Sequence, residues 1–176
     1  MVFTHDTAAA LVAAVALVNS AAEPDTLTTR AQLDAFLAEH GYSGGRRGDV
    51  ADLESVRALR GPLRELLTAD RDEAVRIANR MLAGHEVRPQ LVRHDGWDYH
   101  LHVVAPDAPL ADQIAVETAM AMGDVIRGDE LSRLSVCADA VCGGLVLDLS
   151  RNRSRRFCST ACGNRVAAAA YRARRA

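Results

Sequence analysis

Apolar residues are nearly continuous from residue 8 to residue 18 and recur at helical spacing in several later segments. A segment that is apolar on all sides is typical of a helix at the centre of a core, whereas i, i+3, i+4 and i+7 spacing indicates a helix with one buried face. We therefore predict a central, buried helix at residues 6–21. Amphipathic helices are expected at residues 30–40, 49–67, 72–83 and 109–127, with a kink or restart at Gly61-Pro62.

Residues that favour helix ends stand where these segments begin and stop. Thr29 can cap the second helix, and Asp70 with Glu73 three residues later is similar to a capping box. Asp6 or Thr7 can cap the first helix. The segments are followed by glycines of the kind that commonly end helices, namely Gly41, Gly84 and Gly128.

Residues 87–104 have a different pattern, because two short runs rich in apolar and aromatic residues flank an Asp95-Gly96 pair. An Asp-Gly pair between such runs is a strong β-hairpin signal. Pro106 and Pro109 end the second run. The sequence therefore predicts an α+β, mostly helical N-terminal domain at residues 1–132 with one β-hairpin.

Charge is distributed unevenly, although the formal net charge is only −2. Residues 149–176 contain eight arginines and no acidic residue, which gives +8, whereas residues 1–148 have thirteen arginines against twenty-three acidic residues, which gives −10. A basic end of this kind is typical of a segment that binds a polyanion or docks on an acidic part of the same chain. The composition, 49% hydrophobic and 25% charged, is that of a folded globular protein.

All four cysteines lie within residues 137–162. Four residues separate Cys137 from Cys142, three separate Cys158 from Cys162, and fifteen lie between the two pairs. Two close pairs joined by a returning segment suit the tetrahedral geometry of zinc, and the clustering favours a metal over stapling disulfides. We therefore predict one structural zinc ion, with a pair of disulfides or an iron–sulfur cluster as alternatives. A catalytic zinc is not expected, because four thiolates leave no position for water.

Arginines surround the second cysteine pair. Residues 150–156 form a basic loop, and the alanine-rich segment 163–172 predicts a helix whose arginines share one face. Such a loop and helix suit phosphate contacts and a few base contacts. Alternatively, some of these arginines offset the charge of the zinc thiolates. The candidate nucleic-acid-binding residues are Arg151, Arg153, Arg155, Arg156, Asn164, Arg165, Arg172 and Arg175.

The motifs around the cysteines resemble those of the CGNR zinc-finger family. The resemblance implies a small, treble-clef-like zinc finger at residues 133–176 that follows an alanine-rich helical domain called ABATE, which belongs to stress-induced transcription regulators. Leu17-Val18-Asn19 and Leu63-Arg64 are similar to that domain. The finger has three residues between its last two cysteines, where the family commonly has four. The matching motifs are Cys137-x4-Cys142-Gly143-Gly144, Arg155-Arg156-Phe157-Cys158 and Cys162-Gly163-Asn164-Arg165.

Histidines offer a weaker candidate for a second site. His100 and His102 lie on one face of the second run, and with His94 or His85 they could bind a metal, although such histidines are more often ordinary strand residues. No glycine-rich phosphate loop, nucleophile elbow or paired-carboxylate motif is present in the sequence. We therefore do not expect an enzyme.

These patterns lead to a functional hypothesis. We expect a cytoplasmic, DNA-binding transcription regulator whose N-terminal domain senses a small-molecule effector or forms a homodimer. A zinc-stabilised protein-interaction module and a small-molecule-binding protein without DNA contact are the alternatives. No membrane association is expected, because the apolar run at residues 8–18 is too short to span a bilayer. A secretory signal is a minor alternative for this run, because the positively charged flank of such a signal is missing.

Overall fold

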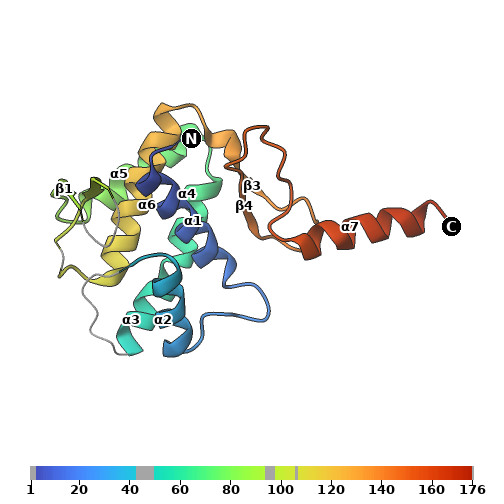
Figure 1. Ribbon diagram of the computed structural model, residues 1–176, viewed down its shortest axis with the longest axis horizontal. Helices are drawn as coiled ribbons and strands as arrows, with labels where there is room; N and C mark the ends of the chain where they lie inside the picture. The colour runs from blue at the N-terminus through green and yellow to red at the C-terminus, as the bar shows by residue number, and fades with distance from the viewer. Residues whose placement is uncertain (1–2, 43–49, 94–97, 106, 176) are drawn as a thin grey trace.

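The computed structural model describes residues 3–42, 50–93, 98–105 and 107–175. Most helices form one body, and the last helix extends away from it to the C-terminus (Figure 1). None of the described helices is long and apolar enough to cross a membrane. The elements are α1 (His5–Asn19), α2 (Arg30–Glu39), α3 (Val50–Ala58), α4 (Arg60–Thr68), α5 (Arg71–Ala83), β1 (Gln90–Val92), β2 (His100–His102), α6 (Leu110–Arg127), η1 (Leu131–Arg133), β3 (Leu134–Val136), β4 (Leu145–Leu147) and α7 (Thr160–Ala173).

Helix α1 lies at the centre of the core, as its apolar sequence predicts. Leu11 and Leu17 on this helix are fully buried, and α1 packs against α4 and α6. Helix α6 contributes Ile114 and Met122, which are also fully buried. Burial of each such side chain contributes about 1.5–3 kcal/mol. This packing holds the C-terminal end of α1, where Asn19 lies, in one position.

The helix ends confirm two predicted caps and correct a third. Thr29 caps α2 through a complete capping box, and the Asp70 side chain accepts a backbone N–H bond at the start of α5. The prediction that Asp6 or Thr7 caps α1 is wrong, because Thr4 is the N-cap residue. Both predicted residues lie inside the first helical turn, where the backbone is already helical.

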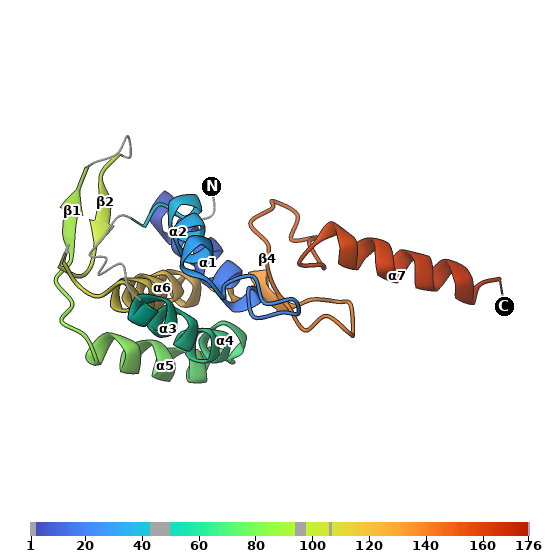
Figure 2. The ribbon, with the colours of Figure 1, turned by 90° about the horizontal axis from the view of Figure 1, so that it is seen from below.

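The predicted β-hairpin is present but shorter than the sequence pattern indicates. Strands β1 and β2 have three residues each and pair antiparallel, with Leu91 opposite Leu101. These leucines are 69% and 40% exposed, so the hairpin buries little apolar surface. It lies at one end of the molecule, opposite α7 (Figure 2). The Asp95-Gly96 pair of the predicted turn lies outside the described residues.

The predicted break in the third helical segment occurs at Leu59, which is the N-cap residue of α4. Pro62 then lies in the first turn of α4, where its missing N–H leaves no helical bond unmade. The Arg60 guanidinium donates to Asp25 at 2.8 Å and to the Ser20 hydroxyl at 2.8 Å. The bond from Arg60 is the main cause that lowers the pKa of Asp25 to about 2. These contacts tie the connection between α1 and α2 to α4.

A second hairpin, which the sequence pattern does not predict, joins the helical body to the cysteines. Strands β3 and β4 pair antiparallel, with Val136 opposite Leu145. Leu145 and Leu147 are buried in the same core as α1 and α4, whereas Val146 is buried among the cysteines. Alternate side chains of one strand therefore belong to two clusters. The protein is α+β and mostly helical, with a small finger at its C-terminal end, as predicted.

Candidate metal centre and basic surface

The four cysteines meet between the β3–β4 hairpin and the start of α7. Cys137 follows β3 and Cys142 lies shortly before β4, so both belong to the connection within one hairpin. Cys158 directly precedes Ser159, the N-cap residue of α7, and Cys162 lies in the first turn of that helix. All four Sγ atoms lie within 4.8 Å of one another. The structure thus brings the two predicted pairs together.

The positions of the sulfur atoms fit one tetrahedral zinc ion. Zinc–thiolate bonds of about 2.3 Å imply a tetrahedron of sulfurs with edges of about 3.8 Å. The Cys158 Sγ lies 3.4 Å from that of Cys142 and 3.7 Å from that of Cys162, and none of the four cysteines forms a disulfide. A zinc ion held by these residues joins the hairpin to α7 and closes the finger. Four protein thiolates make this a structural site.

The N-terminal end of α7 is built around these cysteines. The Ser159 hydroxyl accepts a bond from the Cys162 N–H at 3.3 Å, and the Cys158 N–H points to the Cys137 Sγ at 3.5 Å. Burial opposes ionisation of Cys137, but this N–H and neighbouring bonds outweigh it and lower the pKa of the thiol. Because Ser159 caps the helix, α7 begins at Thr160, three residues before the predicted start.

Arg165 lies beside the cysteines. Its Nε donates to the Asp139 carboxylate at 2.6 Å, and its Nη2 donates to the Cys162 Sγ at 3.4 Å. Burial opposes ionisation of Asp139, but the bond from Arg165 outweighs it and lowers the pKa of this carboxyl. The same bond raises the pKa of Arg165. The guanidinium therefore faces thiolate charge, one of the alternatives stated for the arginines of this region. Asp139 was missed, although an acidic residue between two ligand cysteines is a usable signal.

Two adjacent glycines follow Cys142 for different physical reasons. Gly143 has a φ of 65°, a conformation that favours glycine. A side chain at Gly144 would lie 3.2 Å from the Cys158 Sγ and 3.3 Å from both the Cys142 Sγ and the Asn19 Oδ1. Residues 137–144, which form the knuckle around Cys137 and Cys142, therefore need glycine at both positions. Gly143 allows the positive φ, and Gly144 leaves room for the sulfur atoms and Asn19.

Two polar side chains attach this knuckle to the helical body, and the sequence pattern predicts no such role for either of them. Asn19, at the C-terminal end of α1, accepts a bond from the Leu145 N–H at 2.6 Å and donates to the Leu145 carbonyl at 2.9 Å. Arg64 of α4 donates to the Gly143 carbonyl at 2.8 Å. Asn19 of α1 therefore binds both the backbone N–H and the backbone carbonyl of Leu145, three residues after Cys142. These two bonds anchor the metal centre on α1.

We expect Asn19→Ala to lower the free energy of unfolding of the zinc-loaded protein by about 2 kcal/mol. The substitution leaves the buried Leu145 N–H without its acceptor, and an unsatisfied buried group costs about 1–3 kcal/mol. Urea unfolding followed by circular dichroism measures this change. Asn152→Ala, in the exposed basic loop, is the matched control and should change stability by less than about 0.5 kcal/mol. Equal stability of Asn19→Ala and wild type would contradict an anchoring role.

Two arginines of the basic loop contact the protein itself. The Arg153 guanidinium pairs with Glu130 at 2.7 Å and donates to the Ser132 hydroxyl at 2.9 Å. The Arg155 guanidinium donates to three backbone carbonyls, which draws the loop against the finger. The acceptors are the carbonyls of Leu147, Phe157 and Cys158, at 3.5, 3.3 and 3.2 Å.

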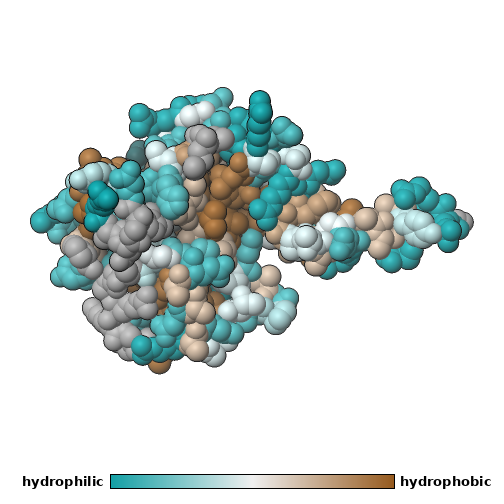
Figure 3. Space-filling view, in the orientation of Figure 1, coloured by the Kyte–Doolittle hydropathy of each residue, from teal (hydrophilic) through white to brown (hydrophobic). Residues whose placement is uncertain are grey.

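The remaining nucleic-acid candidates are exposed, and no carboxylate of the described residues pairs with them. Arg156 lies over the Phe157 ring and Arg175 over the Tyr171 ring, at 5.9 and 4.7 Å from the ring centroids. Cys162 is the one buried residue of α7, and the far end of this helix is hydrophilic (Figure 3). These remaining candidates are Arg151, Arg156, Asn164, Arg172 and Arg175, and Arg174, which was not predicted, is exposed beside them.

The histidines considered for a second metal site do not all come together. The Nε2 atoms of His100 and His102 lie 3.1 Å apart, so these two rings face each other as their spacing predicts. His85 instead faces Asp112 of α6, with 3.4 Å between Nε2 and Oδ1, and His94 lies outside the described residues. Within the described ranges, the cysteines are the one group of three or more residues placed to hold a metal ion.

Fold and site together define a class of protein, in which a helical domain is packed on a four-cysteine zinc finger. Comparison with protein families agrees with this class. The family described as "CGNR zinc finger" matches residues 133–175, and the family ABATE, described as "Putative stress-induced transcription regulator", matches residues 11–129. The chain belongs to the ABATE family, and its C-terminal zinc site is that of a CGNR zinc finger. Comparison with curated proteins gave no match.

Proposed function

We propose that this protein is a transcription regulator that binds DNA through the exposed arginines of its finger. The observation that supports the proposal most is the placement of α7, which extends from the body (Figure 1) and exposes Arg172 and Arg175. The segment 149–176 contains no acidic residue. A zinc ion at the base of α7 would hold this cationic surface in one orientation, which reduces the entropy lost on binding.

The exposed guanidinium groups suit contact with a phosphate backbone. Arginines that lack carboxylate partners can replace the counterions condensed on DNA, which is the main source of sequence-independent affinity. Arg151 and Arg156 lie on the loop before the base of α7, and Asn164 lies near that base. We assign the arginines to phosphates and Asn164 to a base edge, because amide side chains form paired bonds with adenine.

The double substitution Arg172→Gln and Arg175→Gln tests this proposal. If each arginine contacts one phosphate, the slope of log affinity against log salt concentration should fall by about 2, since each contact contributes about 0.9. A mobility-shift titration with duplex DNA at about 50–200 mM salt measures the slope. Arg127→Gln, which removes an 85% exposed arginine from α6, is the matched control. An unchanged slope in the double variant, or no shift of any duplex by wild type, would refute the proposal.

The N-terminal domain would act as the sensor of a small effector or as the dimerisation unit. The protein would work by binding and not as an enzyme, because four thiolates leave no open position on zinc. We place it in the cytoplasm, where clustered thiols stay reduced.

A second candidate function is a protein-interaction module. Arg153 pairs with Glu130 and Arg165 with Asp139, so this basic segment does bind carboxylates. Under this alternative, an acidic polypeptide such as polyglutamate would compete with DNA at equal charge concentration.

A further inference from the structure

An open groove of about 480 Å³ lies between α1 and the finger. Helix α1 forms one side with Val12 and Val15, and β4 with the loop after it forms the other, including Leu147 and Leu149. Val12 is 41% exposed and Leu149 is 39% exposed. Apolar surface is visible where the body meets the finger (Figure 3). This size and apolar character are typical of small-molecule sites, which often lie between domains.

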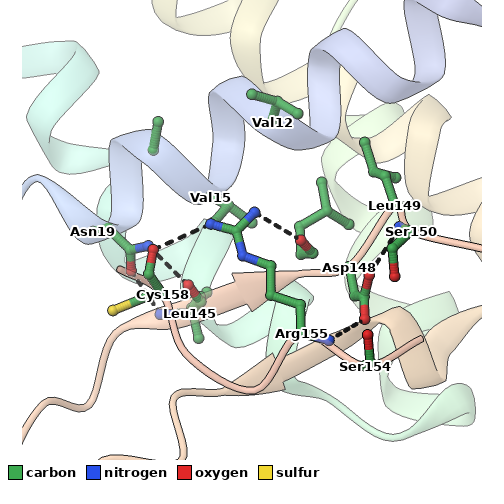
Figure 4. A pocket seen from close by; sticks show the side chains of 12 residues that line it. Val12, Val15, Asn19, Leu145, Asp148, Leu149, Ser150, Ser154, Arg155 and Cys158 are labelled. Carbon is green, nitrogen blue, oxygen red and sulfur yellow. Dashed lines mark hydrogen bonds between the residues drawn. The ribbon is translucent and has the colours of Figure 1, made fainter. Parts of the chain in front are cut away.

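The polar side of the groove is dominated by one cation. Figure 4 shows the Arg155 guanidinium lying under α1 beside Val15. A guanidinium has five N–H groups, and the described residues supply three acceptors to Arg155, all of them neutral backbone carbonyls. Two N–H groups therefore have no acceptor in the described part of the chain. No carboxylate there pairs with this arginine.

The acidic residue that lines the groove has its oxygens occupied. One Asp148 carboxylate oxygen accepts a bond from the backbone N–H of Ser150 at 2.8 Å, and the other accepts a bond from the backbone N–H of Arg155 at 2.6 Å. The buried Arg133 guanidinium lies nearby and donates to the Asp148 carbonyl at 2.9 Å. The thiolate of Cys158 also lines the groove, and a bound zinc ion would take up part of its charge. Arg155 is therefore the one cation among the residues that line the groove, and its two remaining guanidinium N–H groups are the charged donors open to a ligand there.

We propose that this groove binds a small apolar molecule that carries one carboxylate. Its apolar part would cover Val12 and Val15, and its carboxylate would accept the two remaining Arg155 N–H bonds. Such bonds between arginine and a carboxylate are commonly paired and strong. The occupant would touch α1 and the finger at the same time, beside the Asn19 contact that joins them. This inference extends the sensor role proposed above, and its test contains no DNA, so either proposal can fail while the other stands.

The test uses 2-naphthoate as the probe. Its binding to the zinc-loaded full chain is measured by isothermal titration calorimetry. We expect saturable binding of one probe per chain. The uncharged analogue 2-naphthamide should bind at least about tenfold more weakly, because it lacks the charge that Arg155 recognises. This comparison needs no variant, so it does not depend on the folding of a mutant.

Val12→Glu locates the site. The new carboxylate lies in the groove, competes for Arg155 and repels the probe, so naphthoate affinity should fall at least about tenfold. Val75→Glu makes the same change on α5, where the valine is 37% exposed, and should leave affinity unchanged. Absence of saturable naphthoate binding, equal binding of the amide, or equal affinities of the two glutamate variants would overturn the proposal.

Discussion

Replacing Cys162 with serine should reduce the zinc content from one ion per chain to nearly none and unfold α7. Cys162 is a ligand in the first turn of that helix and its one buried residue. A helix of 14 residues is marginal in water without tertiary contacts, even when it is rich in alanine. Its order therefore depends on the metal centre, because binding energy at a structural zinc site is also folding energy.

Native mass spectrometry gives the zinc content of this variant, and far-ultraviolet circular dichroism gives the helix content. Val141→Ser is the matched control, because Val141 lies between Cys137 and Cys142 and is 81% exposed. It introduces serine close to the metal centre without removing a ligand and should keep one zinc ion. Full zinc occupancy in Cys162→Ser would show that the four thiols do not form one site.

Replacing Glu117 with glutamine should stabilise the protein by about 2–3 kcal/mol above pH 7 and change little below pH 5. Burial, and then the charge of Asp6, raises the pKa of Glu117 from 4.5 to about 7. Each pKa unit corresponds to about 1.4 kcal/mol. The folded protein thus holds this proton more tightly than the unfolded chain. The stabilisation is complete below pH 4.5 and is lost as the pH rises through 7, where ionised Glu117 remains partly buried.

Urea unfolding of both proteins at several values between pH 5 and 8 measures this effect. The difference between variant and wild type isolates Glu117, because the thiolates of the zinc site titrate in both. Glu65→Gln, an exposed change on α4, is the control and should give a difference that is small and independent of pH. A stability difference for Glu117→Gln that stays constant across this range would contradict the raised pKa.

The helical segments and the cysteine centre could be predicted because their signals are local. An apolar run around residues 8–18 has few alternatives to a buried helix. Thr29 caps α2 as predicted, since a cap needs one side chain and a backbone N–H nearby. The close pairs around Cys137 and Cys158 likewise had to lie in tight turns to bind one ion.

The hairpin β3–β4 and the anchoring role of Asn19 could not be predicted in the same way. Each strand has three residues, which is too short for an alternating pattern to stand out, and residues 137–144 between them are too many for the two-residue turn signal that marks the first hairpin. The Asn19 contact joins residues 126 positions apart, and an asparagine at a helix end has many other partners available. Its role becomes visible once α1 and β4 are packed together.

The sequence by itself determined the chemistry of this protein: four thiols at zinc-binding spacing, a helical body and an excess of arginine at one end. Only the tertiary structure decided what each arginine does. Arg165 faces Asp139 and the cysteines, Arg155 lies in the groove under α1, and Arg172 remains exposed on α7. Side chains of one type differ in this way because the partner of a guanidinium is whichever acceptor the packed chain brings within about 3 Å. That proximity is set by contacts between segments far apart in sequence.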